Sequence, residues 1–312
     1  MLSRTADNLY WTGRYIERAE NLARVLDVSY RNALLDLPGA PPESEWRDAL
    51  ASLGNPRQFA ERKLRLNETD VTRFFTVDVE SPCSIKVCMH AARENTRAQR
   101  SVISTEMWES INTTWLAVRD LDEAGLRQRG LREFFDWVKD RSHLFRGVSH
   151  STTLHDDAFH FLRLGTFLER ADSTARLLDS KFHALDGMDA EAAGITYYAW
   201  GSVLRQASAF RAYHQTYHDV ITPRRVAELL ILRLEMPRSL RFCASQVVEH
   251  LDALGGTRDI EAQRLAGELH ARLRFARIDR VLGEGLHEFL AEITARIAEL
   301  SAQLARDFLM TV

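Results

Sequence analysis

The stretch that decides the fold is GRYIERAENLARVLD, from Gly13 to Asp27. It returns about half a chain later as GTFLERADSTARLLD, from Gly165 to Asp179. Eight of the fifteen aligned positions are identical, and four more exchange similar residues. We call these stretches the first phrase and the second phrase. A helical stretch written twice predicts two related halves, each with a Glu-Arg pair at the same place.

Two further matches follow in the same order, each 155 residues apart, against 152 for the phrases. They pair residues 82–88 with 237–243, and residues 130–135 with 285–290. Three ordered matches predict a duplication that has since diverged. The halves are unequal, because Arg14 is aligned with Thr166 and Cys83 with Arg238. Any site formed by both halves is therefore expected to be asymmetric.

Helix-forming patterns dominate the rest of the chain, while glycine and proline fall mostly at expected helix boundaries. The expected helices span residues 5–36, 46–53, 56–65, 83–97, 99–121, 131–148, 154–185, 192–217, 223–233, 237–253, 258–278 and 286–309. Only residues 74–79 have a strand-like composition, and a single such run has no pairing partner. We predict an all-α fold, a single helical bundle of two duplicated, pseudo-symmetric halves. It would form one domain over residues 1–312, with the repeat in 1–150 and 151–312.

Composition narrows the class of protein. The net charge is −3 and no basic block stands out, so nucleic acid is not an expected partner. No apolar run approaches the ~20 residues of a membrane span, and the N-terminus lacks the pattern of a signal peptide. The three cysteines are few, odd in number and not spaced for zinc. We therefore expect a cytoplasmic protein.

The phrases carry charged residues where a helix buried on most sides is expected. Apolar residues occur all around both phrases, which indicates helices inside a larger protein. The charged residues expected to be at least partly buried are Glu17, Arg18, Glu169 and Arg170. Buried charges need partners. Helical spacing offers Glu17 local partners in Arg14 and Asn21, whereas Arg18 points about 100° away and needs a partner on another helix.

Two interpretations of these charges stay open. They could be structural ion pairs that tie long helices together, or they could line a polar cavity that binds an anionic or amide-bearing group. A second polar stretch, residues 92–100, places Arg93, Arg97 and Arg100 on one helical face beside Glu94. It is equally consistent with a solvated amphipathic face and with part of such a site.

Other chemistry finds less support. His214 and His218 have a spacing that could share a metal ion, but they lack an obvious set of further ligands. A second cluster lies at residues 155–160, and a Glu-x-x-His match at 284–287 contains a glycine. Phosphate-binding glycine loops, a Gly-x-Ser-x-Gly elbow and a plausible Cys-His dyad are missing from the sequence. We predict no metal site and no nucleotide site on this chain.

The polar stretches resemble those of the bacterial alpha-E domain family, named for an all-helical fold with a recurrent Glu-Arg motif. The resembling segments are residues 8–21, 92–97, 104–109 and 237–239, so the likeness extends over the whole chain. The family commonly has Asn before the proline of the last block and its counterpart, where this chain has Met236 and Ser81. That departure weakens a polar role at those two positions.

The resemblance implies partners and a function. Members of the family occur beside, or fused to, circularly permuted ATP-grasp proteins and transglutaminase-like peptidases. This implies a part in ATP-dependent amide or peptide ligation or modification, with ATP and Mg²⁺ bound by the partner and no cofactor on this chain. Two alternatives stay open: an interaction protein that recruits the ATP-grasp partner, and an independent metal-dependent enzyme.

In the ligation hypothesis, one polar cavity between the halves holds the substrate. Glu17 and Glu169 would be catalytic, holding an amine or acting as bases. The predicted substrate-binding residues are Arg14, Arg18, Asn21, Arg93, Glu94, Arg97, Arg170 and Arg238.

Overall fold

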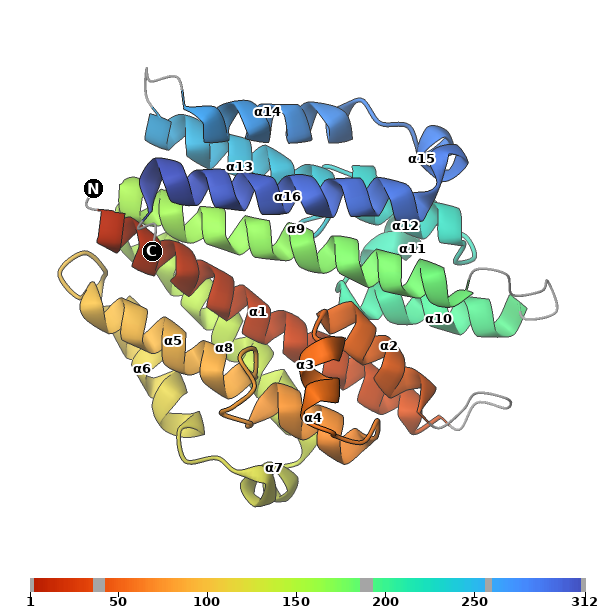
Figure 1. The fold of residues 1–312 in the computed structure, drawn as a ribbon, viewed down its shortest axis with the longest axis horizontal. Coiled ribbons are helices and arrows are strands. Elements are labelled where there is room, and N and C mark those ends of the chain that lie inside the picture. Colours follow the sequence, from red (N-terminus) through yellow and green to blue (C-terminus); the bar gives the residue numbers. More distant parts are fainter. Residues whose placement is uncertain (1–2, 36–42, 186–192, 256–259, 310–312) are drawn as a thin grey trace.

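The computed structural model describes residues 3–35, 43–185, 193–255 and 260–309, and every regular element within them is a helix (Figure 1). The helices are α1 Ser3–Ala33, α2 Ser44–Leu53, α3 Pro56–Glu61, α4 Glu68–Thr76, α5 Ile85–Ala98, α6 Thr105–Val118, α7 Glu123–Arg129, α8 Leu131–Thr152, α9 Asp157–Leu185, α10 Ala193–Gln206, α11 Phe210–Tyr217, α12 Pro223–Leu232, α13 Leu240–Gly255, α14 Glu261–Arg274, α15 Ile278–Glu284 and α16 Leu286–Phe308. The all-α fold class is confirmed. None of the helices described is long and apolar enough to cross a membrane.

Several predicted boundaries were wrong. The helix expected over 192–217 is divided into α10 and α11, with Ser208 between them in the left-handed region at φ 53°. The helix expected over 258–278 ends earlier, at Arg274, and α15 follows where no helix was expected. The first half of the strand-like run, residues 74–76, belongs to α4, where its two phenylalanines are fully buried. Packing in the core overrides the strand propensity of these residues.

The two helices that contain the phrases, α1 and α9, cross at the centre of the molecule and make its most extensive interhelical contact (Figure 1). The backbones touch because each helix has a glycine at the crossing. A Cβ atom on Gly13 would lie 2.1 Å from the carbonyl oxygen of Leu162 in α9. Glycine is therefore required at this position, since no side chain fits between the two backbones.

The apolar core consists of two clusters on either side of this crossing. The first-half core is formed mainly by α1, α4, α5, α6 and α8, and the second-half core by α9 and the helices after it. The phrase helices contribute to both clusters. Leu9 and Tyr10 of α1 belong to the second-half core, while Leu162 of α9 belongs to the first-half core. The two central helices thus connect the cores.

Matching segments before α5 and α13 have matching local geometry. The Ser84 hydroxyl oxygen accepts a hydrogen bond from the backbone N–H of Val87 at 3.2 Å, and that of Ser239 accepts one from Phe242 at 3.0 Å. Both serines stand at the start of their helices. Each is preceded by one member of the aligned pair that distinguishes the halves, Cys83 or Arg238. That the halves arose by duplication stays a prediction.

Candidate functional site

The centre of the crossing holds a fully buried carboxylate, Glu17 of α1, at 0% exposure. Arg170 of α9 donates to both of its oxygens, from Nε to Oε1 at 2.9 Å and from Nη2 to Oε2 at 2.8 Å. Nη1 of Arg238 lies 3.0 Å from Oε1, and Nη1 of Arg146 donates to Oε2 at 2.9 Å. Each oxygen therefore has two guanidinium partners, as a buried charge requires.

The glutamate of the second phrase makes the equivalent contact with the arginine of the first. Glu169 of α9 accepts from Arg18 of α1, from Nε to Oε1 at 2.6 Å and from Nη2 to Oε2 at 2.9 Å. Arg14 adds a hydrogen bond from its Nε to Oε2 at 2.8 Å. The glutamate of each phrase is thus paired with the arginine of the other. The expectation that Arg18 needs a partner on another helix is confirmed.

The local partners expected for Glu17 were wrong. Arg14 reaches across to Glu169, because the close crossing places that carboxylate beside α1. Asn21 instead bridges to the second half, donating from Nδ2 to the Ser173 hydroxyl oxygen at 2.9 Å and accepting at Oδ1 from Nη1 of Arg238 at 2.8 Å. Arg14 and Asn21 therefore make interhelical contacts instead of the expected contacts with Glu17 along α1.

Glu20 is a central member that sequence reasoning left out. It is fully buried and accepts from Nε of Arg24 at 2.7 Å and from Nη2 of Arg238 at 2.6 Å. The Ser142 hydroxyl donates to its other oxygen at 2.8 Å. The signal was present in the sequence, since Glu20 is aligned with Asp172 and stands four residues before Arg24.

The network keeps its carboxylates ionised. Burial by itself would raise the pKa of Glu17, but Arg170, Arg238 and Arg146 outweigh burial and lower the pKa to about 2. Arg14 and Arg18 likewise lower the pKa of Glu169 against the effect of burial. A general base works best with a pKa near the operating pH. The geometry therefore favours holding cations, rather than accepting protons, as the task of Glu17 and Glu169.

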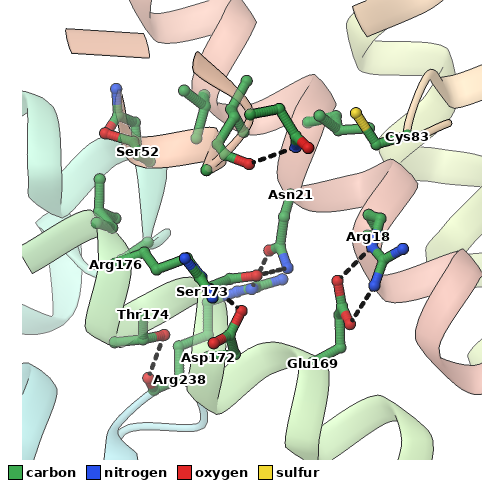
Figure 2. A pocket seen from close by; sticks show the side chains of 18 of the residues that line it. Arg18, Asn21, Ser52, Cys83, Glu169, Asp172, Ser173, Thr174, Arg176 and Arg238 are labelled. Carbon is green, nitrogen blue, oxygen red and sulfur yellow. Dashed lines mark hydrogen bonds and ion pairs between the residues drawn. The ribbon is translucent and has the colours of Figure 1, made fainter. Parts of the chain in front are cut away.

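A cavity of about 350 Å³ opens beside the network, between α1, α2, α9 and the segment before α5 (Figure 2). Pockets for small ligands begin at roughly this size, ~300 Å³. Four of the predicted site residues line it: Arg18, Asn21, Glu169 and Arg238. Glu17, Arg14 and Arg170 belong to the network but are not among the lining residues.

Lining residues that sequence reasoning missed come from both phrases and from other helices. Asp172, Ser173 and Arg176 extend along α9, and Cys83 precedes α5 (Figure 2). The alignment of the phrases could have indicated the first three. Ser52 at the end of α2 could not be found in this way, because its place depends on how α2 packs against α9.

The other predicted polar element lies elsewhere. Arg93 donates from Nε to the amide oxygen of Asn112 at 3.2 Å and stacks 5.4 Å from the ring centre of Trp108. Arg97 pairs with Glu94 at 2.7 Å with 60% of its side chain exposed. The cavity does not include Arg93, Glu94 or Arg97. This face of α5 has the features of a solvated helix surface.

The buried network carries more positive than negative charge. Its carboxylates are Glu17, Glu20 and Glu169, and the guanidinium groups paired with them are Arg14, Arg18, Arg24, Arg146, Arg170 and Arg238. Arg163 adds a further, half-buried guanidinium, whose pKa is lowered to about 10 by burial and then by Arg170 and Arg146. The charged residues that line the cavity itself are more evenly balanced, with Arg18, Arg176 and Arg238 against Glu169 and Asp172.

The histidines considered for metal binding are not gathered into a site. Within the described residues, no group of three or more His, Cys, Asp or Glu side chains could hold a metal ion. His218 lies beyond the end of α11 in the left-handed region at φ 51°, so it is not on the same helical face as His214.

Comparison with known proteins places the whole chain in one family. Residues 1–309 match the model of the Alpha-E family, described as "a predicted alpha-helical domain with a conserved ER motif". An uncharacterized protein of Mycobacterium bovis and two of Mycobacterium tuberculosis are each 25% identical over 318 residues, covering 94% of this chain. The chain spans about a third, 35%, of the length of these relatives. No solved structure matches the chain significantly. The family match over nearly every residue shows that this chain belongs to the Alpha-E family.

Proposed function

We propose that this chain is the non-nucleotide-binding helical component of an ATP-grasp-associated system for amide or peptide ligation or modification. In this system a circularly permuted ATP-grasp protein binds ATP and Mg²⁺, and the cavity beside the Glu-Arg network holds the substrate. The association with ATP-grasp proteins rests on the family resemblance. The greater length of the mycobacterial relatives is consistent with a unit that works together with other protein segments.

The observation that carries the proposal is the cavity itself, which is lined by polar groups that keep hydrogen-bonding capacity for a ligand. Arg18 uses Nε and Nη2 for Glu169, and its Nη1 has no partner within the ranges that the structure describes. Its side chain is 28% exposed, so this nitrogen can donate to a substrate carboxylate. Arg176 extends along the opposite wall (Figure 2). The cavity thus offers cationic groups to an acid and carboxylates to an amine.

The experiment is a ligation assay by mass spectrometry, with the protein, its ATP-grasp partner, ATP and a cell extract. Two cavity variants test the site: Arg18→Ala removes a donor, and Gln58→Trp fills space from the exposed rim without touching the ion pairs. We expect both to lose product while circular dichroism stays helical. Arg97→Ala is the matched control, because this arginine lies outside the cavity. Full ligation by both cavity variants would refute the proposal.

A purely structural role for the network, with the surface recruiting the ligase, is the second candidate. It is favoured by the completeness of the contacts around Glu17, whose two oxygens are each shared by two guanidinium groups. A pull-down with the ATP-grasp protein, set beside calorimetry with amines and peptides, separates the two. Retained pull-down with normal ligation by the cavity variants would favour recruitment.

A further inference from the structure

The two Glu-Arg clusters differ at one aligned pair, Arg238 and Cys83. On the Glu17 side, the guanidinium of Arg238 bridges three acceptors. Its Nη1 lies 3.0 Å from Glu17 Oε1 and 2.8 Å from Asn21 Oδ1, and its Nη2 lies 2.6 Å from Glu20 Oε1. The counterparts of these three residues in the second phrase are Glu169, Ser173 and Asp172.

On the Glu169 side, the matching acceptors lack this bridge. Among the described residues, Glu169 Oε1 has a single donor, Nε of Arg18 at 2.6 Å, whereas Glu17 Oε1 has two guanidinium neighbours. Asp172 accepts at Oδ2 from Arg176 at 2.8 Å, and its Oδ1 has no donor within the described part of the chain. Cys83, which stands where the first cluster has Arg238, has a short thiol side chain and no guanidinium group to offer these oxygens. The space is instead part of the 350 Å³ cavity, whose lining includes Arg18, Cys83, Glu169, Asp172 and Arg176 (Figure 2).

The rest of each cluster corresponds closely, so the difference is local. Arg18 donates hydrogen bonds to Glu169 from Nε and Nη2, as Arg170 does to Glu17. The i,i+4 pair of Arg176 and Asp172 has a counterpart in that of Arg24 and Glu20. The serines after Cys83 and Arg238 both cap their helices through backbone N–H groups. One guanidinium is therefore the main element that the second cluster lacks.

We propose that a guanidinium group of the ligand occupies this place, bridging Glu169 and Asp172 as Arg238 bridges Glu17 and Glu20. The inference rests on the proposed function, and it names the chemical class of the substrate held in the cavity. The fork of a guanidinium presents two separate NH₂ groups to two carboxylates, whereas an ammonium is a point charge. The ligand selected by this place between Glu169 and Asp172, which we call the guanidinium seat, is a small guanidino compound or an arginine side chain.

The surrounding arginines do not exclude such a ligand. Arg238 is itself held beside two carboxylates although Arg24, Arg146 and Arg170 contact the same acids. The Glu169 side has the same balance apart from Arg238, since Glu169 and Asp172 are paired with Arg14, Arg18 and Arg176. A cation in the cavity therefore makes the charge of the second cluster equal to that of the first.

The test is isothermal titration of the whole chain with agmatine, putrescine and succinate. Agmatine carries a guanidinium and an ammonium group, putrescine two ammonium groups and succinate two carboxylates. We expect agmatine to bind more tightly than putrescine or succinate. Asp172→Asn should weaken agmatine at least about tenfold, since a charged hydrogen-bond acceptor is lost. Cys83→Arg should abolish agmatine binding, because the introduced guanidinium fills the seat, and should raise Tm.

Leu154→Arg is the matched control for the added charge, because Leu154 is 82% exposed and does not line the cavity. It should leave agmatine binding unchanged. If Cys83→Arg does not fold, Asp172→Asn still decides the question. Failure of agmatine to bind, tighter binding of putrescine or succinate, or agmatine binding that Asp172→Asn leaves intact would each overturn the inference.

The ligation assay keeps the two proposals apart. Loss of ligation in Arg18→Ala and Gln58→Trp, together with no agmatine binding, would remove the guanidinium seat and leave the proposed function standing. Agmatine binding that depends on Asp172, together with normal ligation by both cavity variants, would remove the ligation role and leave the seat.

Discussion

Gly165 lies directly against the backbone of Tyr10, so closely that a Cβ atom on the glycine would stand 2.0 Å from the tyrosine carbonyl oxygen. The contact is with backbone, which cannot swing aside as a flexible side chain would. Together with the equivalent contact of Gly13, it sets how near α1 and α9 approach. The ion pairs exchanged between the phrases depend on that approach.

Gly165→Ala is therefore expected to destabilise the protein by about 3 kcal/mol or more, as overpacking does when the clash is with backbone. Chemical denaturation followed by circular dichroism measures the change. Gly147→Ala is the control, since Gly147 lies within α8 with nothing within 4 Å of an added Cβ atom. It should stabilise by roughly 0.5–1 kcal/mol, because alanine favours the helix. Equal stability of the two variants would contradict the close approach.

Glu17→Gln should destabilise the fold by roughly 3–5 kcal/mol, because removing one member of a buried ion-pair network leaves charge uncompensated. Three guanidinium groups, from Arg146, Arg170 and Arg238, would lose their shared carboxylate. Glu123→Gln serves for comparison, since its pair with Arg127 lies on the surface and is worth less than about 1 kcal/mol. Urea denaturation midpoints of the two variants measure the difference, and equal midpoints would show that the buried network is dispensable for stability.

Stability should fall in acid over a window set by Glu17. Its pKa is lowered in the folded state from the ordinary value of 4.5 to about 2, so the folded state binds the proton less readily than the unfolded chain. The resulting stabilisation is present above pH 4.5, is lost as the pH falls toward 2, and amounts to on the order of 3 kcal/mol. The pKa values of Glu20 and Glu169 are lowered too and add to the loss. Melting temperatures between pH 7 and 2 test this, and a flat profile would contradict it.

Thiol reagents should modify Cys83 before Cys88 and Cys243. All three thiols have raised pKa values because of burial, but Cys88 and Cys243 are fully buried with pKa values of about 12, while Cys83 lines the cavity. Reaction requires the thiolate and access to it. Peptide mapping by mass spectrometry after brief alkylation of the folded protein gives the order. Equal labelling of the three would contradict preferential access to Cys83 through the cavity.

Much of the architecture could be read from sequence because periodicity reports which helices are buried. The polar residues of the phrases lie among apolar residues on every side, which predicted the burial of Glu17 and Glu169. The helix ends at Gln206 and Arg274 were missed, since nothing in the residue composition there competes visibly with helix. The strand-like composition of residues 74–79 did not produce a strand, because Phe74 and Phe75 pack into the core and that packing decides their conformation.

The sequence predicted many of the residues of the network, but not which of them pair with one another. Spacing along a helix gives the direction of a side chain, so a partner for Arg18 on another helix could be foreseen. It does not give the point at which two helices cross, and the exchange between Arg14 and Glu169 depends on that point. Arg93 and Arg97 share a helical face that looks much like a binding stripe, and only the packing of α5 shows that the cavity lies elsewhere.

The sharing of apolar residues between the two cores has a consequence for synthesis. As the chain leaves the ribosome, the first-half core lacks Leu162, and Leu9 and Tyr10 have no cluster to enter until α9 and later helices emerge. A nascent chain stalled before residue 157 would therefore stay protease-sensitive. Separately expressed halves would be expected to become resistant only when they are mixed.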